Sequence, residues 1–109
     1  MRYHIPIKLP SLANLSHQHW RKLSKLSRSQ KIATAIAIYG RQIPTLPLLV
    51  TITRIGPRKL DDDNLASACK YVRDAIAKKI GVDDGSDQYT WRYNQAIGKY
   101  GVDVEITSR

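Results

Sequence analysis

The chain has 109 residues and carries 18 Lys or Arg against nine Asp or Glu, which gives a net charge of +9. A chain of this length forms one domain, spanning residues 1–109, with a single modest core. The one cysteine excludes an internal disulfide and a thiolate metal cage. No apolar run approaches the ~20 residues that cross a bilayer. The first ten residues, MRYHIPIKLP, lack the apolar block of a signal peptide, so we expect a cytoplasmic protein with no membrane partner and no small-molecule cofactor.

The charge is divided unevenly along the chain. Residues 1–60 hold eleven Lys or Arg and no Asp or Glu, whereas residues 61–109 hold seven basic and nine acidic residues. A one-sided basic surface favours a polyanionic partner, either nucleic acid or an acidic membrane face. The membrane alternative is the weaker one, because no basic amphipathic helix carries a bulky apolar wedge.

The first half of the chain predicts a strand followed by a helix. Apolar and polar residues alternate from Arg2 to Leu9, and Pro6 favours an edge strand over a central one. Three- and four-residue steps then predict a helix from Ser16 to about Tyr39, with Gly40 as its C-cap. The expected apolar positions of this helix are Trp20, Leu23, Leu26 or Ser27, Ile32, Ala35 or Ile36, and Tyr39.

Three residues near the start of this helix have more than one interpretation. Trp20 is interpreted as a core anchor rather than a platform for stacking on a base. His17 and His19 are two positions apart, so on a helix they point away from each other and do not favour a shared metal. We expect them to be exposed or to make polar contacts near DNA.

A second strand and a second helix follow. The β-branched run from Leu48 to Ile55 predicts a buried or half-buried strand. The second helix is expected to begin near Asp63 or Asn64 and to run to about Ile80, with Gly81 as its stop. Its predicted apolar positions, which include Cys69 as a small buried hydrophobe, are Leu65, Ala68, Cys69, Val72, Ala75, Ile76 and Ile80.

Two more strands complete the predicted fold. They are expected at Tyr89–Ile97 and Val102–Ile106, joined as a hairpin through residues 98–101. The order is therefore β, α, β, α, β, β. This order predicts an α+β fold, with a small mixed sheet of about four strands and two helices on one face.

Seven of the nine acidic residues lie between Lys59 and Gln88, mostly in two clusters about one helix apart. Crowded carboxylates on a basic chain repel one another unless a cation offsets them. Mg²⁺ takes oxygen ligands and commonly binds through a few carboxylates and substrate phosphates, so the clusters suggest metal-assisted attack on a phosphodiester. The structural alternative is that they serve as helix caps and turns.

The motif D-x-D-N at Asp61, Asp63 and Asn64, a lysine further along at Lys70, and D-D-G at Asp83 and Asp84 resemble the RusA family of Holliday-junction resolvases. That family is common in bacteria, phages and prophages. The resemblance covers essentially the whole chain, and its specificity lies in about 30 residues. It implies a Mg²⁺-dependent endonuclease that cuts four-way DNA junctions as a homodimer.

Carried over to this chain, the resemblance makes Asp61, Asp63 and Asp84 the essential carboxylates and Lys70 a phosphate-contacting or catalytic lysine. The best-known member has its lysine at the position held here by Ser67, so either residue is a candidate for that role. Asp62 and Asp83 are further candidate metal ligands. Candidate contacts to the DNA backbone, which position DNA without reading its sequence, are Arg21, Lys22, Lys25, Arg28, Arg58 and Lys59.

Helix length predicts where the metal site can form. A straight helix of 17 residues from Asn64 to Ile80 is about 25 Å long, whereas carboxylates that share one Mg²⁺ must each approach it to ~2.1 Å. Within one chain Asp63 and Asp84 would therefore lie too far apart. A two-fold dimer with a composite site at its interface removes the conflict.

Lys70 follows Asp63 by seven residues, so on a continuous helix it returns to nearly the same face. It could extend toward the metal site, or it could form an ion pair with Asp74. Two alternatives to a junction resolvase stay open: a non-catalytic, basic DNA-binding protein, and a nuclease for other branched or flap DNA or for RNA.

Overall fold

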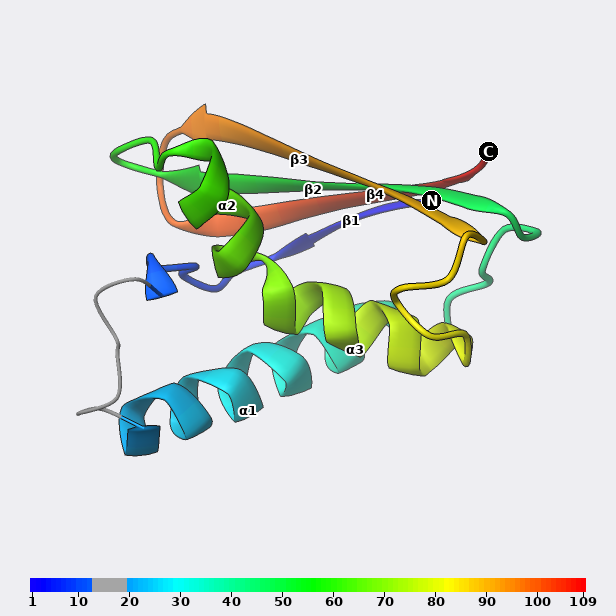
Figure 1. Ribbon diagram of the computed structural model, residues 1–109, viewed down its shortest axis with the longest axis horizontal. Coiled ribbons are helices and arrows are strands. Elements are labelled where there is room, and N and C mark those ends of the chain that lie inside the picture. The colour runs from blue at the N-terminus through cyan, green and yellow to red at the C-terminus, as the bar shows by residue number, and fades with distance from the viewer. Residues whose placement is uncertain (13–19) are drawn as a thin grey trace.

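The computed structural model describes residues 1–12 and 20–109. A four-stranded mixed sheet carries all its helices on one face (Figure 1), which confirms the α+β prediction. The predicted helix start at Ser16, and also His17 and His19, fall outside the described residues. The elements in chain order are β1 (Arg2–Ile5), α1 (Trp20–Ile38), β2 (Leu48–Gly56), α2 (Asp62–Ala68), α3 (Lys70–Ile80), β3 (Tyr89–Ile97) and β4 (Gly101–Ser108).

The strand order in the sheet is β1-β4-β2-β3. β2 pairs parallel with β3 and antiparallel with β4, so β3 and β4 are not neighbours and the predicted hairpin is wrong. The reason is that the apolar, β-branched run of β2 takes the central position of the sheet. β1 pairs only with β4, which confirms the edge strand, and it ends at Ile5, directly before Pro6.

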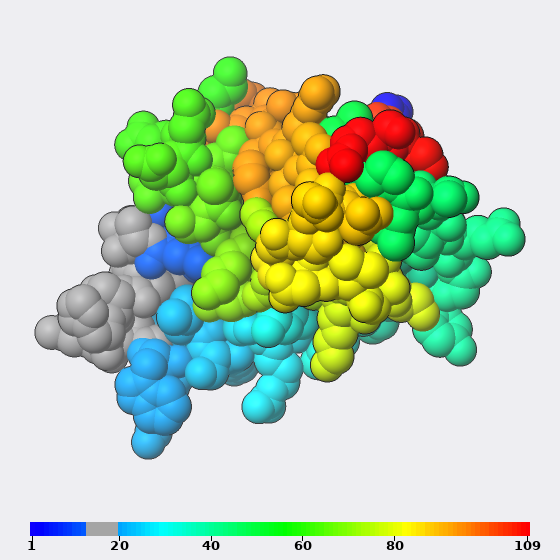
Figure 2. All heavy atoms as spheres, turned by 45° about the vertical axis from the view of Figure 1, so that its right-hand side comes forward, coloured from blue at the N-terminus to red at the C-terminus, as the bar shows by residue number. Residues whose placement is uncertain are grey.

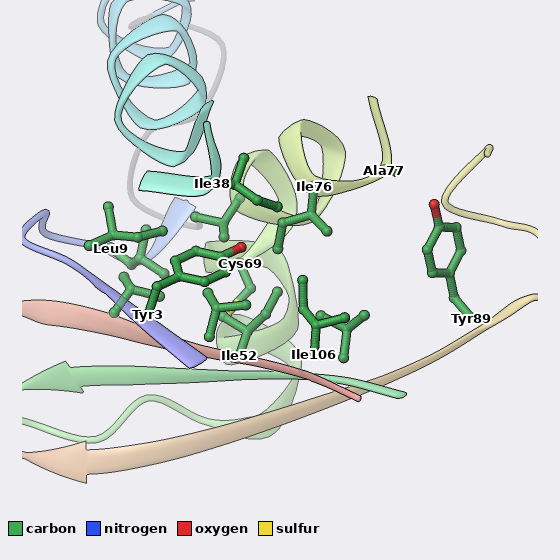
Figure 3. Close-up of a cluster of buried hydrophobic side chains, with 14 of the residues drawn as sticks. Tyr3, Leu9, Ile38, Ile52, Cys69, Ile76, Ala77, Tyr89 and Ile106 are labelled. Carbon is green, nitrogen blue, oxygen red and sulfur yellow. The ribbon is translucent and has the colours of Figure 1, made fainter. Parts of the chain in front are cut away.

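The core lies between the sheet and the helices (Figure 3). Every second residue of β2 is buried, from Leu48 to Gly56, as expected for a strand with one face against helices and one face outward. In the second helical region the predicted apolar positions are confirmed: Leu65, Ala68, Cys69, Val72, Ala75 and Ile76 are buried, and Ile80 is half-buried.

The predicted apolar face of α1 is correct only in part. Leu23, Leu26 and Ser27 are half-buried, whereas Trp20, Ile32, Ala35 and Ile36, and also Tyr39 just after the helix, are exposed. The buried positions are Gln30, Thr34 and Ile38. The interpretation of Trp20 as a core anchor is therefore wrong, since 63% of it is exposed. The prediction followed large side chains, whereas the face of α1 that packs on α3 and β1 also carries the polar residues Gln30 and Thr34 beside Ile38. Thr34 satisfies its hydroxyl by donating to the carbonyl of Gln30 (2.8 Å).

The predicted second helix is divided into two. α2 ends and α3 begins on either side of Cys69, which has φ −85° and ψ −2°, and the two helices run in different directions (Figure 1). The expectation of one straight helix is therefore wrong. Cys69 is buried where the two helices meet. The change of direction there lets each helix turn its apolar positions toward the core. α3 stops at Gly81, whose φ of 87° is the left-handed conformation that favours glycine.

Arg54 is a buried cation on the helix-covered face of β2, with 5% of its surface exposed. Its Nε donates to the carbonyl of Leu9 (2.7 Å) and its Nη1 to the carbonyl of Arg58 (2.8 Å). Carbonyl oxygens thus offset part of the cost of desolvating the charge. Gly56 makes room for this guanidinium, since a Cβ there would lie 3.1 Å from Nη1.

Within the part of the chain that the structure describes, no helix combines the length and the apolar character needed to cross a membrane.

Candidate functional site

The first acidic cluster, Asp61 to Asp63, is an exposed group at the start of α2. Asp61 holds the N-cap position, but its side chain makes no capping hydrogen bond. Within the described residues, none of the three carboxylates forms a hydrogen bond or an ion pair. The structural alternative holds in part, because the three carboxylates lie at the N-terminal end of a helix, where its dipole favours negative charge, but none of them makes the side-chain hydrogen bond of a cap.

A side chain of β3 fixes the main chain just before this cluster. The amide of Gln95 accepts a hydrogen bond from the Leu60 N–H (2.7 Å) and donates one to the Leu60 carbonyl (2.8 Å). Two opposed hydrogen bonds to one residue determine both its position and its orientation. Asp61 follows directly and is thereby fixed relative to the sheet.

The second acidic cluster lies in the loop between α3 and β3. Asp83 accepts a hydrogen bond from the Gly85 N–H (3.0 Å), which is the Asx turn of the structural alternative. Asp84 has a different environment: its carbonyl accepts from Trp91 Nε1 (2.9 Å), and its carboxylate is paired with Arg73.

Arg73 of α3 ties this loop to the helix and to the sheet. Its Nε donates to Asp84 Oδ2 (2.9 Å), its Nη2 to the Asp84 carbonyl (3.1 Å) and its Nη1 to the Tyr93 hydroxyl (2.8 Å). Its guanidinium also lies 4.8 Å from the centre of the Trp91 ring. Burial lowers the pKa of Arg73, but the interactions with Tyr93 and Asp84 outweigh burial and raise that pKa above its ordinary value.

Side chains on one face of β3 hold the two segments that carry the acidic clusters, one near each end of the strand. Trp91 holds the loop with Asp84 and Gln95 holds Leu60. These anchors are four residues apart, about 13 Å at ~3.3 Å per residue. In the described residues 1–12 and 20–109, no group of three His, Cys, Asp or Glu could hold a metal ion. Asp61, Asp63 and Asp84 of one chain therefore do not make a Mg²⁺ site.

The prediction from helix length does not apply to this chain. The predicted straight helix of about 25 Å is not formed, because the helical region is divided at Cys69. The anchors on β3 set the distance between the clusters instead.

Lys70 is exposed and is the first residue of α3, so it does not lie on a continuous helix with Asp63. Its Nζ lies 5.9 Å from the centre of the Tyr71 ring, and Lys31 of α1 lies 5.6 Å from the same ring. No ion pair of the described residues joins Lys70 to Asp74. Ser67, the other candidate for the family lysine position, is exposed on α2.

The six candidate DNA contacts are all exposed. Arg58 and Lys59 lie in the loop that leads into the first acidic cluster, so two cations directly precede its carboxylates. The other four lie on the N-terminal half of α1, and Figure 2 shows this half at the same end of the molecule as α2. No ion pair within the described residues engages any of the six: Arg21, Lys22, Lys25, Arg28, Arg58 and Lys59.

Sequence reasoning missed Arg73, Trp91, Tyr93 and Gln95. The last three alternate along β3, so the period of a half-covered strand places them on one face. Arg73 interrupts the apolar side of its helix, between Val72 and Ile76. A cation at such a position needs a partner, and this was the available signal.

Comparisons of the chain with protein-family models, with curated proteins and with solved structures gave no match.

Proposed function

We propose that this chain is a Mg²⁺-dependent endodeoxyribonuclease that acts on four-way DNA junctions as a homodimer, as its resemblance to the RusA family implies. It would act in recombination and repair in the cytoplasm of a bacterium, encoded by the host or by a phage or prophage. Asp61, Asp63 and Asp84 are the proposed metal ligands, with Asp62 and Asp83 beside them.

One observation carries the proposal. The carboxylates at the start of α2 are exposed and have no partner among the described residues, although the chain has twice as many cations as anions. Three adjacent carboxylates repel one another; the N-terminus of α2 offsets part of this repulsion, and a bound cation would offset more of it. In a composite site, Asp61 and Asp63 of one subunit and Asp84 of the other would hold the ion.

A bound divalent ion supplies Lewis-acid activation of the scissile phosphate and a bound water of lowered pKa. The remaining work belongs to this chain's residues. Gln95 fixes the backbone before Asp61, and Arg73 fixes the loop that carries Asp84. Arg58, Lys59 and the cations of α1 would hold the DNA backbone, with an affinity that falls steeply as salt rises.

Cleavage of a synthetic four-way junction with Mg²⁺ and with chelator tests the proposal. Asp63→Asn should abolish cleavage and keep or improve binding, because it removes a ligand and one negative charge. Arg92→Gln, on the opposite face of the sheet, is the control that should cleave normally. Full cleavage by Asp63→Asn would exclude this residue as a ligand, and equal cutting of linear duplex would point to a nuclease without junction preference.

Mixed dimers test the composite arrangement. A heterodimer of Asp63→Asn and Asp84→Asn subunits regains one intact site if the ligands cross the interface. It regains none if each subunit is self-sufficient. Absence of nicking in a verified heterodimer would refute the shared site.

A second candidate function is a non-catalytic, basic DNA-binding protein. The Arg73–Asp84 ion pair and the Asx turn at Asp83 favour it, because both give the second acidic cluster a structural role. Junction binding with no Mg²⁺-dependent cleavage of any branched substrate would support this function over the nuclease.

A further inference from the structure

The free edge of the sheet is formed by β3. The strand order places β3 at one side, bonded only to β2. In this parallel ladder the Leu48 N–H donates to the Gln88 carbonyl (2.8 Å) and the Gly98 N–H donates to the Gly56 carbonyl (3.0 Å). The even-numbered residues of β3 therefore face β2, and the odd-numbered ones direct their N–H and C=O groups outward.

This edge is open and lacks the usual protection. Of the outward main-chain groups between Tyr89 and Ile97, only the Tyr89 N–H has a hydrogen-bond partner among the described residues, the Ser86 carbonyl. The strand has nine residues and contains no proline; Arg92 is its one charged residue, and it ends in Ile97, which is 61% exposed. Natural edge strands are commonly short, bulged, charged or covered, so an edge of this kind is suited to pairing with another strand.

The two halves of the candidate site are arranged symmetrically along this edge. Trp91 anchors the Asp84 loop and Gln95 anchors the segment before Asp61. Tyr93 lies midway between them, and all three residues direct their main-chain groups outward. A two-fold axis at Tyr93 would pair Trp91 with Gln95 of a second copy, and Gln95 with Trp91 of that copy.

We infer that β3 is the dimerisation strand and that it pairs antiparallel with β3 of a second copy, in the register that places Tyr93 opposite Tyr93. All odd-numbered residues then form hydrogen-bonded pairs, with about six main-chain hydrogen bonds at the centre of the interface. The two sheets become one continuous sheet of eight strands.

This register has a direct consequence for the site. Paired strands are ~4.8 Å apart, much less than the ~13 Å between the two anchors within one chain. The loop with Asp84 is thus brought beside the Asp61 cluster of the other copy, twice, by symmetry. Only the role of the Asp84 loop beside the Asp61 cluster of the other copy rests on the proposed function, because the pairing of the two strands itself needs no metal and no DNA.

A disulfide on the open face of the sheet tests the register. In the inferred dimer, Arg92 faces Asn94 of the second copy in a non-hydrogen-bonded pair, where Cα atoms are ~4.5 Å apart and a disulfide can form. The double variant Arg92→Cys/Asn94→Cys should form a covalent dimer under mild oxidation, with 92–94 linkages in its peptide map. Buried Cys69 does not compete for oxidation.

The matched control is Arg92→Cys/Ala96→Cys. It has the same loss of charge and the same number of exposed thiols, but no facing pair in this register. Sedimentation of the unmodified protein should also show a dimer. A monomer in sedimentation, no cross-link in the first variant, or equal cross-linking in the control would overturn the inference.

Failure of the proposed function gives a different pattern. Efficient 92–94 cross-linking in a protein that cuts no DNA would leave the interface standing and remove the nuclease. Recovery of nicking in mixed Asp63→Asn and Asp84→Asn dimers without the cross-link would keep the nuclease and place its dimer on another surface.

Discussion

Replacing Arg73 with Gln removes a side chain that joins α3, β3 and the loop carrying Asp84. Gln is too short to reach the Asp84 carboxylate, the Asp84 carbonyl and the Tyr93 hydroxyl together. The variant thus loses three hydrogen bonds of 2.9, 3.1 and 2.8 Å. It also loses the contact of the guanidinium with the Trp91 ring at 4.8 Å.

The expected loss of stability follows from these contacts. Each hydrogen bond contributes roughly 1 kcal/mol net, and the cation–π contact adds about 0.5–1 kcal/mol. The Arg73 and Asp84 side chains are 28% and 36% exposed, so solvent screening reduces the ionic part toward that of a surface pair. We therefore expect Arg73→Gln to lower the free energy of unfolding by about 2–3 kcal/mol, a Tm decrease of roughly 10 °C for a domain of this size.

Urea unfolding followed by far-UV circular dichroism measures this loss, because the signal does not depend on Trp91, which touches Arg73. Wild type and variants are compared at one protein concentration, since the stability of a dimer depends on concentration. Arg92→Gln, exposed on the other face of β3, is the charge-matched control and should change stability by less than ~0.5 kcal/mol.

A double-mutant cycle with Asp84→Asn should give a coupling energy of about 1 kcal/mol. A loss below ~1 kcal/mol for Arg73→Gln, or an equal loss for Arg92→Gln, would refute the assignment of Arg73 as the residue that holds the loop.

Three further predictions concern packing, pH and metal. Gly56→Ala should destabilise the fold by roughly 1–3 kcal/mol, because its Cβ would press on the buried guanidinium of Arg54. Gly101→Ala should cost less than about 1 kcal/mol. The ring of His4 that its Cβ would meet is half exposed, and turning this ring away breaks only the surface contact of His4 Nδ1 with Asp103 (2.6 Å). Equal losses for the two glycine variants in urea unfolding would contradict this reasoning. Burial raises the pKa of the Cys69 thiol from 9.0 to about 12, so the unfolded chain loses this proton at lower pH than the folded chain. The free energy of unfolding should therefore fall between pH 9 and 12 by up to ~1.4 kcal/mol per pH unit, with no contribution from Cys69 below pH 9. Cys69→Ala should remove this contribution to the pH dependence of stability. Chelation of divalent ions should weaken the dimer without abolishing it, because the acidic clusters that meet across the interface then repel each other while the strand pairing remains. An unchanged dimer dissociation constant in sedimentation would show that metal and pairing are not linked.

Much of the fold could be predicted from the chain alone. The β-branched run at Leu48–Ile55 predicted a buried or half-buried strand, and Gly81 marked a helix end. Strand neighbours could not be predicted in the same way, because the short connection after Ile97 suits a hairpin and also suits a chain that passes over the end of β2. The break at Cys69 had no local signal either, since no Gly or Pro interrupts the helical pattern there.

The candidate site was predictable only in part. The carboxylates form runs along the chain, so Asp61 to Asp63 and Asp83 to Asp84 were found by spacing. Their supports were not, because Arg73 meets its partners 11 and 20 positions away and Gln95 meets Leu60 across 35. Such contacts follow from the way the helices lie on the sheet, which no local pattern specifies.

Arg54 joins two stretches of backbone that are far apart in the chain. Its guanidinium donates to the carbonyls of Leu9 and Arg58, so the residues that follow β1 and the loop between β2 and α2 are held by the same side chain. Loss of this guanidinium would release Leu9 and Arg58 together, and the loop that leads into the first acidic cluster would lose its tie to the N-terminal part of the chain.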